Sequence, residues 1–191
     1  GRALTMTGRE CDVPIATGAP QITPVPFAAE LQPIIDFMAQ NPQPPMTEAS
    51  LRSVGGFGPG FPDAATAARG RAVTAEELVI PGPAGAPDLE ITVFRPADET
   101  ADEALPVLVN FHGGGMIVGH RSWEHGRVIE LVERHGVIGV NVEYRLAPEH
   151  PFPAGVEDNY AATVWVSEHA AELGADPSRL IVMGGSAGGG F

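Results

Sequence analysis

Polar and hydrophobic residues follow two different patterns in the chain from about residue 72 onward. Val73–Ile80 and Leu89–Phe94 are short apolar runs with alternating neighbours, and the sequence PGPAGAPD joins them. Alternation on both sides of turn-forming residues predicts a β-hairpin at the edge of a sheet. The next run, Leu105–His112, is largely apolar, as a buried parallel strand requires, and three glycines follow it.

The remaining elements are predicted from the same patterns. They are a helix over Trp123–His135 that Gly136 can end, a strand over Val137–Val142, a helix over Val156–Leu173 and a short strand over Leu180–Met183. Strands that alternate with helices indicate a parallel sheet with helices on its faces. The predicted fold class is therefore α/β, with a mostly parallel sheet.

The first 70 residues are different, because they are rich in proline, glycine and alanine. One helical segment is predicted from apolar residues at helix-face spacing, namely Phe27, Leu31, Ile34, Ile35 and Met38. Between Asn41 and Pro62, prolines and glycines are too frequent for a long helix. We interpret residues 1–70 as a cap or lid arm over a core formed by residues 71–191. The alternative is a mobile proline-rich tail.

Composition and charge narrow the classes of function. A chain of 191 residues is long enough for one domain with a core. Its 11 basic residues, all arginine, stand against 24 acidic ones and give a formal charge of −13. This charge repels phosphate backbones, so a nucleic-acid partner is not expected.

Cysteine content and the N-terminal residues carry little signal. Cys11 has no partner for a disulfide and no neighbouring metal-ligand spacing, and no metal is expected. The first twenty residues contain no continuous apolar run, so neither a signal peptide nor a membrane span is predicted. A cytoplasmic location is the default expectation.

The strongest chemical signal is the sequence GGSAG at residues 184–188, directly after a predicted strand. A serine on a sharp strand-to-helix turn projects its hydroxyl into the open, and only very small residues two positions away avoid collision. Ser186 is therefore the candidate nucleophile, and Gly184, Gly185 and Gly188 form the elbow that presents it. The alternatives are a glycine-rich turn or a phosphate-binding loop. Because the chain contains no lysine, a Walker-type loop is excluded.

The second signal is His112 followed by Gly113, Gly114 and Gly115, again after a buried strand. Acyl transfer creates an oxyanion, which an enzyme stabilises with preorganised backbone N–H donors. Glycines allow the backbone to approach such a group closely. A flexible glycine hinge is the alternative, and it is weak for both motifs together.

Three motifs together carry a resemblance to a known family. They are FHGGG at 111–115, YRLAPEHPFPAGVED at 144–158 and DPSRLIVMGGSAGGG at 176–190. The chain resembles the hormone-sensitive-lipase-like family of α/β-hydrolases, bacterial esterases with an HGGG motif. The resemblance covers the chain from about residue 70, and the N-terminal arm is similar to the helical cap of that family.

This resemblance implies an activity and a role for each site residue. It implies a carboxylesterase that acts on short- to medium-chain esters, with Ser186 as nucleophile and without metal or organic cofactor. His112 would organise its loop rather than act as general base. The implied oxyanion donors are the backbone N–H groups of Gly114, Gly115 and Ala187, with Gly113 adjacent.

Four positions depart from the usual family pattern. Gly185 stands where relatives most often have Asp, Gly190 where they have Asn, Glu143 where Asp is usual, and Met116 where an aromatic residue is common. These departures bear on substrate preference and elbow rigidity more than on the class of reaction.

The remainder of a catalytic triad is not predicted within these residues. A serine nucleophile needs a base and an acid, which follow it in this fold in the order Asp or Glu and then His. Phe191 is only five residues beyond Ser186, and none of the six histidines is assigned a catalytic role. We expect a C-terminal remainder of the same protein to supply both groups, and poor folding without it.

Alternative functions remain open at this point. The same machinery could act on an amide or an acetylated small molecule. A different class is a non-catalytic receptor or pseudo-hydrolase, as the plant gibberellin receptors show for this family, although intact Ser186 and HGGG argue against it. A structural fragment is the least favoured alternative. The expected partners are a small-molecule ester and the C-terminal remainder, and a homo-oligomer is left open.

Overall fold

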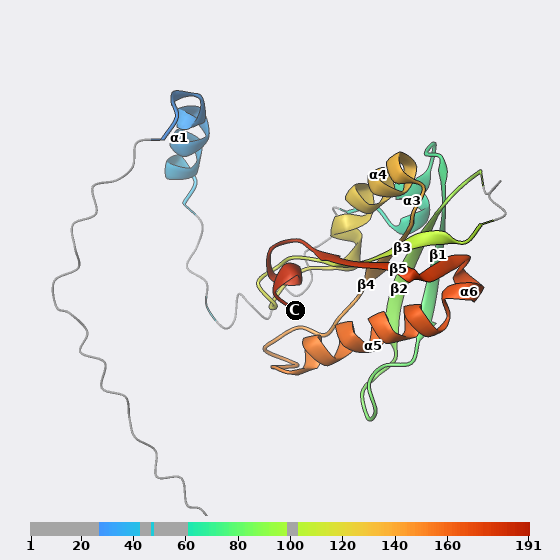
Figure 1. Cartoon of the computed structure of the whole chain (residues 1–191). Coiled ribbons are helices and arrows are strands. Elements are labelled where there is room, and N and C mark those ends of the chain that lie inside the picture. The colour runs from blue at the N-terminus through green and yellow to red at the C-terminus, as the bar shows by residue number, and fades with distance from the viewer. Residues whose placement is uncertain (1–26, 43–46, 48–60, 99–102) are drawn as a thin grey trace, which may run out of the picture. The chain divides into compact units, whose positions relative to one another are not determined.

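The computed structural model describes residues 27–42, 47, 61–98 and 103–191. The chain divides into two compact units, Gly1–Pro45 and Met46–Phe191. In the first unit, a short 3-10 helix η1 (Ala29–Leu31) leads into α1 (Gln32–Gln40), the helix that the sequence predicts in the arm (Figure 1). Pro33 is tolerated near its start because the first helical N–H groups need no intrahelical acceptor. The interpretation of the arm as a cap stays a prediction.

A five-stranded mixed sheet forms the second unit, in the order β1-β2-β4-β3-β5. Its strands are β1 (Val73–Ile80), β2 (Leu89–Pro96), β3 (Leu105–Phe111), β4 (Ile138–Val142) and β5 (Ala175–Gly184). β1 and β2 form the predicted antiparallel hairpin, and β2 pairs antiparallel with β4. β3 lies between β4 and β5 and is parallel to both. The part of the sheet that follows the hairpin is therefore parallel, as predicted.

Helices cover both faces of this sheet (Figure 1). On one face lie α3 (Ala64–Ala68) and α4 (His125–His135), which the 3-10 helix η2 (Arg121–Glu124) precedes. On the other face lie α5 (Ala154–Glu168) and α6 (Ala170–Leu173). Gly136 ends α4 with a left-handed φ of 60°, the helix stop that the sequence predicts. Parallel strands joined by helices on both faces are the α/β architecture.

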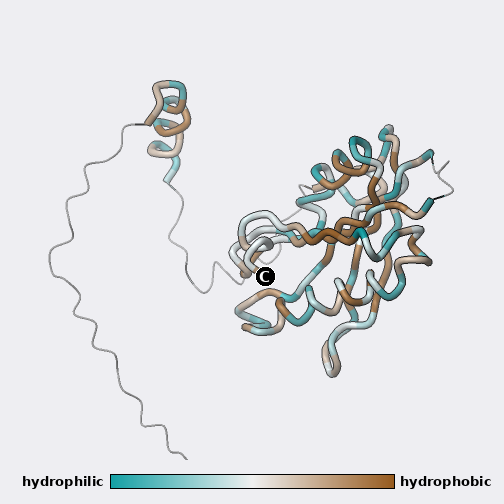
Figure 2. Tube along the Cα trace, in the orientation of Figure 1, coloured by the Kyte–Doolittle hydropathy of each residue, from teal (hydrophilic) through white to brown (hydrophobic). Residues whose placement is uncertain are grey.

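The hydrophobic core has two layers, one on each face of the sheet. Alternation along β2 shows the division, since Ile91 and Val93 belong to the layer with α5 and α6, whereas Phe94 packs with α3 and α4. All three side chains are fully buried. Figure 2 shows the strands in the middle of the unit as its most hydrophobic stretch. Burial of such side chains stabilises the fold by about 1.5–3 kcal/mol each.

The largest differences from the predicted element boundaries concern the last helix and the last strand. The helix predicted over Val156–Leu173 begins earlier, at Ala154, and is interrupted at His169, so it forms two helices. β5 begins at Ala175 instead of Leu180, because Leu105 already pairs with Ala175 ahead of a register shift. The polar residues that hid this early start hydrogen-bond to one another, with Asp176 accepting from Ser178 and Arg179.

The segment next to the predicted domain boundary lies in the second unit. α3 is within the predicted arm of residues 1–70, yet Ala64 is buried in the core layer beneath α4. Asp63 starts α3 as its N-cap by accepting a hydrogen bond from the Thr66 N–H at 2.6 Å. Most of the proline- and glycine-rich stretch from Asn41 to Pro62, like Cys11, lies outside the described residues. No helix in the described ranges is long and apolar enough to cross a membrane.

Candidate active site

The two glycine-rich motifs meet because their strands are neighbours. Phe111, the last residue of β3, pairs with Gly184, the last residue of β5, so both loops leave the sheet at the same edge. The Gly185 N–H donates to the Phe111 carbonyl oxygen at 3.3 Å. A Cβ atom added to Gly113 would lie 3.4 Å from the Ser186 Cβ. The predicted nucleophile, Ser186, therefore lies next to Gly113 of the predicted oxyanion loop.

Ser186 sits on a strained turn at the end of β5. Its φ is 52°, in the left-handed region that a non-glycine residue rarely adopts, and the residue is exposed. A single 3-10 turn, η3 (Ser186–Gly190), follows it. The turn needs two glycines, because a Cβ on Gly184 would overlap the Gly188 carbonyl group and one on Gly188 would overlap the Phe111 carbonyl oxygen. This is the sharp backbone that an exposed nucleophile requires.

The oxyanion loop reaches the Ser186 turn at Gly113 and continues into Gly114 and Gly115. Gly114 and Gly115 have φ values of 129° and 63°, and the Gly114 carbonyl oxygen accepts from the N–H groups of Ile117 and Val118. Within the described residues, nothing accepts a hydrogen bond from the N–H of Gly114 or Gly115. The Ala187 N–H lies in the first turn of η3, where helical donors lack intrahelical acceptors. Their role as oxyanion donors stays a prediction.

His112 is buried at the start of the loop and is not placed as a base. Its ring stacks on Tyr144 with centroids 4.2 Å apart, and its Nδ1 lies 2.8 Å from the Gly113 carbonyl oxygen. Burial lowers the pKa of His112 to about 4, so the ring is neutral at pH 7. The contacts fit an organising role for this residue.

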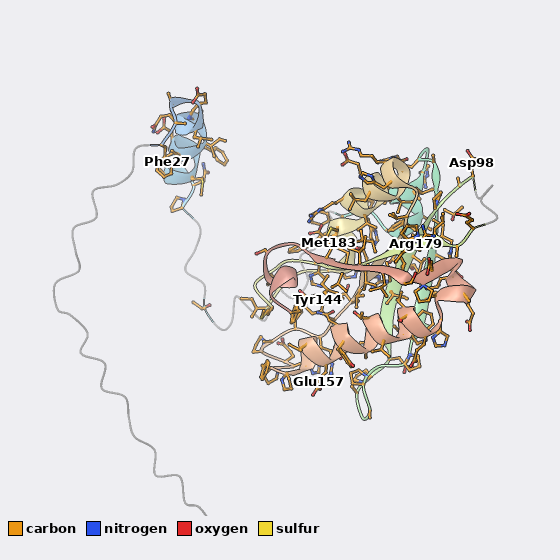
Figure 3. All side chains as sticks on the ribbon, in the orientation of Figure 1. Phe27, Asp98, Tyr144, Glu157, Arg179 and Met183 are labelled. Carbon is orange, nitrogen blue, oxygen red and sulfur yellow. The ribbon has the colours of Figure 1, made fainter. Side chains whose placement is uncertain are left out.

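A third segment, for which the sequence predicts no functional role, contacts the oxyanion loop at three points. It follows β4 and runs from Glu143 to Ala147. The Tyr144 hydroxyl donates to the His112 carbonyl oxygen at 2.7 Å, and the Ala147 N–H donates to the Met116 carbonyl oxygen at 3.0 Å. The Glu143 carboxylate accepts from the Arg121 N–H at 2.7 Å. Figure 3 shows Tyr144 beside the C-terminal turn, where its ring also meets Phe191.

One signal could have pointed to this segment. β4 lies next to β3 in a parallel sheet, and the carboxyl ends of parallel strands form the usual site of ligands and catalytic loops. Residues directly after β4 are therefore expected near those directly after β3. From the sequence alone, YRLAP is only part of a family resemblance, and Glu143 is only a departure from the family pattern.

An ion pair between Arg145 of this segment and Asp158 of helix α5 attaches the segment to the core. Asp158 is fully buried and accepts from the Arg145 main-chain N–H at 2.9 Å and from its guanidinium at 2.7 Å. Removal of either partner from a buried, hydrogen-bonded ion pair of this kind strongly lowers the free energy of unfolding. The segment is thus tied both to the oxyanion loop and to the core.

A cavity of about 370 Å³ opens beside the oxyanion loop. Its walls are formed by the loop, by the segment that leads into α5 and by the C-terminal turn, with Gly115, Met116, Ile117, Arg145, Ala147, His150, Phe152, Pro153, Gly155, Val156, Gly190 and Phe191. Most of these residues are apolar, as in pockets that take small organic ligands. Met116, one of the four departures from the family pattern, is one of its walls and is 41% exposed.

A general base for Ser186 is not among the described side chains. All six histidines are described, and none of them hydrogen-bonds to the Ser186 hydroxyl. His120 instead contacts Ser122, and His169 contacts the Trp165 carbonyl oxygen. In the described ranges, no group of histidine, cysteine and acidic side chains is arranged to hold a metal ion. A catalytic Asp and His supplied by a C-terminal remainder stay a prediction.

Comparison with known proteins agrees with this geometry. Residues 108–191, from the middle of β3 to the end of the elbow, match a family described as the alpha/beta hydrolase fold. The chain has the α/β-hydrolase fold. Among solved structures, the hyperthermophilic esterase of Pyrobaculum calidifontis superposes with a TM-score of 0.65 at 31% identity, over 86% of this chain and 51% of that one.

Relatives of this α/β-hydrolase chain confirm the resemblance to the hormone-sensitive-lipase-like esterases. It is 42% identical over 113 residues to the esterase LipI of Mycobacterium tuberculosis, and 47% identical over 109 residues to the carboxylesterase NlhH of the same organism. The matches cover 59% and 55% of this chain but only 35% and 32% of those proteins. The chain therefore spans about a third of the length of the relatives it matches.

Proposed function

We propose that the protein is a serine carboxylesterase that hydrolyses short- to medium-chain esters through an acyl-enzyme on Ser186. One observation carries this proposal: Ser186 is exposed with a φ of 52° and lies next to Gly113, and the N–H groups of the following Gly114 and Gly115 have no acceptor among the described residues. Its relatives, named esterase and carboxylesterase, support the same class of reaction.

In this mechanism, the Ser186 Oγ attacks the ester carbonyl carbon and its proton passes to a base. The carbonyl oxygen becomes an oxyanion, which the N–H groups of Gly114, Gly115 and Ala187 stabilise. The alcohol leaves with a proton from the conjugate acid of that base, and water then hydrolyses the acyl-enzyme by the same route in reverse. Loss of one oxyanion donor typically lowers kcat by about 100- to 1,000-fold.

The cavity next to Met116 supports the preference for short and medium acyl chains. It is apolar, closed on one side by the oxyanion loop and limited to about 370 Å³. A cytoplasmic location and a C-terminal remainder that brings the base and acid belong to the same proposal. These two parts rest on the sequence alone.

The N-terminal arm completes the proposal as a cap over the substrate site. What supports this role is the apolar face of α1, where Ile34, Phe37 and Met38 recur at helix-face spacing. A helix with such a face usually packs it against another surface. Substitution of Ile34 and Phe37 by serine should then raise KM for longer acyl esters and leave KM for acetate esters nearly unchanged.

A fluorophosphonate probe tests the proposed chemistry directly. We expect the intact protein to be labelled on the peptide that contains Ser186, and the Ser186→Ala variant to remain unlabelled. Nitrophenyl esters of increasing acyl length should then give the highest kcat/KM at short to medium chains. A folded protein that binds esters but is neither labelled nor active would contradict the proposal and favour a receptor or pseudo-hydrolase.

A further inference from the structure

The oxyanion loop, from His112 to Arg121, is held at its start, middle and end by one other segment. The three contacts are those of Tyr144 with His112, Ala147 with Met116, and Glu143 with Arg121, described above. Two of them are made by side chains and one by the backbone. The elbow approaches the loop at His112, Gly113 and Met116 but not at Arg121, so it does not hold the end of the loop.

The contacts matter because the internal hydrogen bonds of the loop join only neighbouring residues and do not tie its two ends to the rest of the fold. Gly114, Gly115 and Met116 all have positive φ values, and two of the three are glycines with wide conformational freedom. An oxyanion hole is effective only when its donors are already in place, because reorganisation during the reaction offsets the stabilisation. An outside scaffold is therefore needed to keep the donors of Gly114 and Gly115 directed at the reacting oxygen.

We propose that the segment Glu143–Ala147 positions the oxyanion loop, with the Glu143 carboxylate and the Tyr144 hydroxyl as its positioning groups. This inference rests on the proposed esterase function for its kinetic consequences, and on the contacts alone for its structural ones. Neither residue touches the substrate in this role. Each acts through the loop backbone.

Glu143 is suited to this role by its surroundings. The Arg121 guanidinium, whose side chain is 8% exposed, lies 3.7 Å from the Glu143 carboxylate and is shared with Glu90 at 2.8 Å and Glu77 at 3.6 Å. His120 approaches the same carboxylate at 3.5 Å. Glu143 alone of the three acids accepts the main-chain N–H at the end of the loop. The other two meet only the Arg121 side chain.

Three variants separate positioning from general structural support. Tyr144→Phe removes one donor and keeps the ring that stacks on His112, and Glu143→Gln removes the carboxylate at the other end. We expect kcat to fall about 2- to 10-fold in each, because Tyr144→Phe loses one hydrogen bond and Glu143→Gln keeps an acceptor oxygen but loses the charge that strengthens its bond, with KM nearly unchanged. Glu90→Gln is the matched control, because it takes a carboxylate from the same Arg121 and leaves the loop backbone untouched. Its kcat should equal that of the wild type.

The pH dependence gives a second signature that a purely structural role would not produce. Burial raises the pKa of Glu143 to about 7, so its carboxylate gains charge between pH 6 and 8 and accepts a stronger hydrogen bond. The ratio of wild-type to Glu143→Gln kcat should rise over this range, since the titration of the catalytic base cancels in the ratio. The corresponding ratio for Tyr144→Phe should stay flat. A flat ratio for Glu143→Gln, or a Glu90→Gln variant as slow as Glu143→Gln, would overturn the assignment of Glu143.

Hydrogen exchange of the intact protein tests the inference without any activity. The peptide covering residues 113–121 should exchange faster in Tyr144→Phe and Glu143→Gln, whereas the peptide covering residues 128–135 of α4 should be unchanged. If the wild type is neither labelled nor active, the proposed function fails, and the exchange rates still decide this inference. Reduced kcat without faster exchange in the loop would overturn it.

Discussion

The elbow and the oxyanion loop are both glycine-rich turns at the same edge of the sheet, but their shapes have different origins. The elbow depends on Gly184 and Gly188, four residues apart, which must lack side chains for the backbone to pass. The oxyanion loop depends on partners that are far away in the sequence, since Tyr144 is 32 residues from His112 and Glu143 is 22 residues from Arg121. Gly188 is also constrained by a distant segment, because its Cβ would overlap the Phe111 carbonyl oxygen. The GxSxG motif nevertheless contains the small residues that the elbow needs, whereas HGGG specifies only a loop that another segment must shape.

The largest expected effect comes from removing the anchor of that other segment. Asp158→Ala leaves Arg145 without its buried partner and should lower the free energy of unfolding by about 3–5 kcal/mol. Urea denaturation of the intact protein measures this change. Glu157→Ala is the control, because the Glu157 carboxylate, next to Asp158 in the sequence, is exposed. Its loss should lower the free energy of unfolding by less than about 0.5 kcal/mol. Equal destabilisation by the two variants would mean that Asp158 is not an anchor.

The second prediction breaks the elbow from within. In Gly188→Ala, the new Cβ would overlap the carbonyl oxygens of Phe111 and His112, so β3 and the elbow must move apart. A displacement of about 1 Å at a catalytic group costs on the order of 100-fold in rate, and labelling of Ser186 by a fluorophosphonate should slow by at least that factor. In the control Gly190→Ala, the nearest atom to the new Cβ is the Met116 Cε at 3.6 Å, an ordinary contact. Its labelling rate should match that of the wild type.

The elements that the sequence predicts correctly are those set by patterns within a short stretch of the chain. The hairpin, β3, α4 and β4 follow from alternation, apolar runs and the helix stop at Gly136, all of which are nearest-neighbour signals. Ser186 and its two essential glycines belong to the same class. The early start of β5 at Ala175 was missed, because its pairing with Leu105 is a tertiary contact made by a segment with polar composition.

The functional segment after β4 was missed for the same physical reason. Nothing in the residues Glu143 and Tyr144 shows that their side chains reach His112 and Arg121, because this follows from the order of strands in the sheet. The break between α5 and α6 is a further case, since no proline or glycine marks His169 as an interruption. Contacts between distant segments decide these features, and one sequence does not contain them in readable form.

The third prediction measures how much strain the oxyanion loop itself carries. Gly115 has a φ of 63°, and a Cβ there would meet nothing closer than the Ile117 Cγ1 at 3.6 Å. Gly115→Ala should therefore lower the free energy of unfolding by only about 1–2 kcal/mol, the cost of a left-handed alanine. Gly126→Ala gives the opposite sign, because this exposed glycine lies in α4 with open space around it and should stabilise by about 0.5–1 kcal/mol. Thermal unfolding compares the two, and destabilisation by both would indicate that backbone conformation is not the cause.

The smallest effect separates the two loops by pH. The oxyanion loop has an ionisable group near each end, His112 with a pKa lowered to about 4 by burial and Glu143 with a pKa raised to about 7, whereas the elbow residues 184–190 have none. Unfolding restores both to their ordinary values, so the contribution of His112 to stability is full above about pH 6.5 and is lost as the pH falls toward 4. The contribution of Glu143 has the opposite sign, because it is full below pH 4.5 and is lost as the pH rises through 7. The two slopes oppose each other between about pH 4.5 and 6.5, and Glu143→Gln removes one of them. The free energy of unfolding of this variant should then rise more steeply with pH than that of the wild type, by up to about 1.4 kcal/mol per pH unit. Urea denaturation at pH 5, 6 and 7 measures the difference, and parallel curves would show that Glu143 keeps its ordinary pKa in the fold.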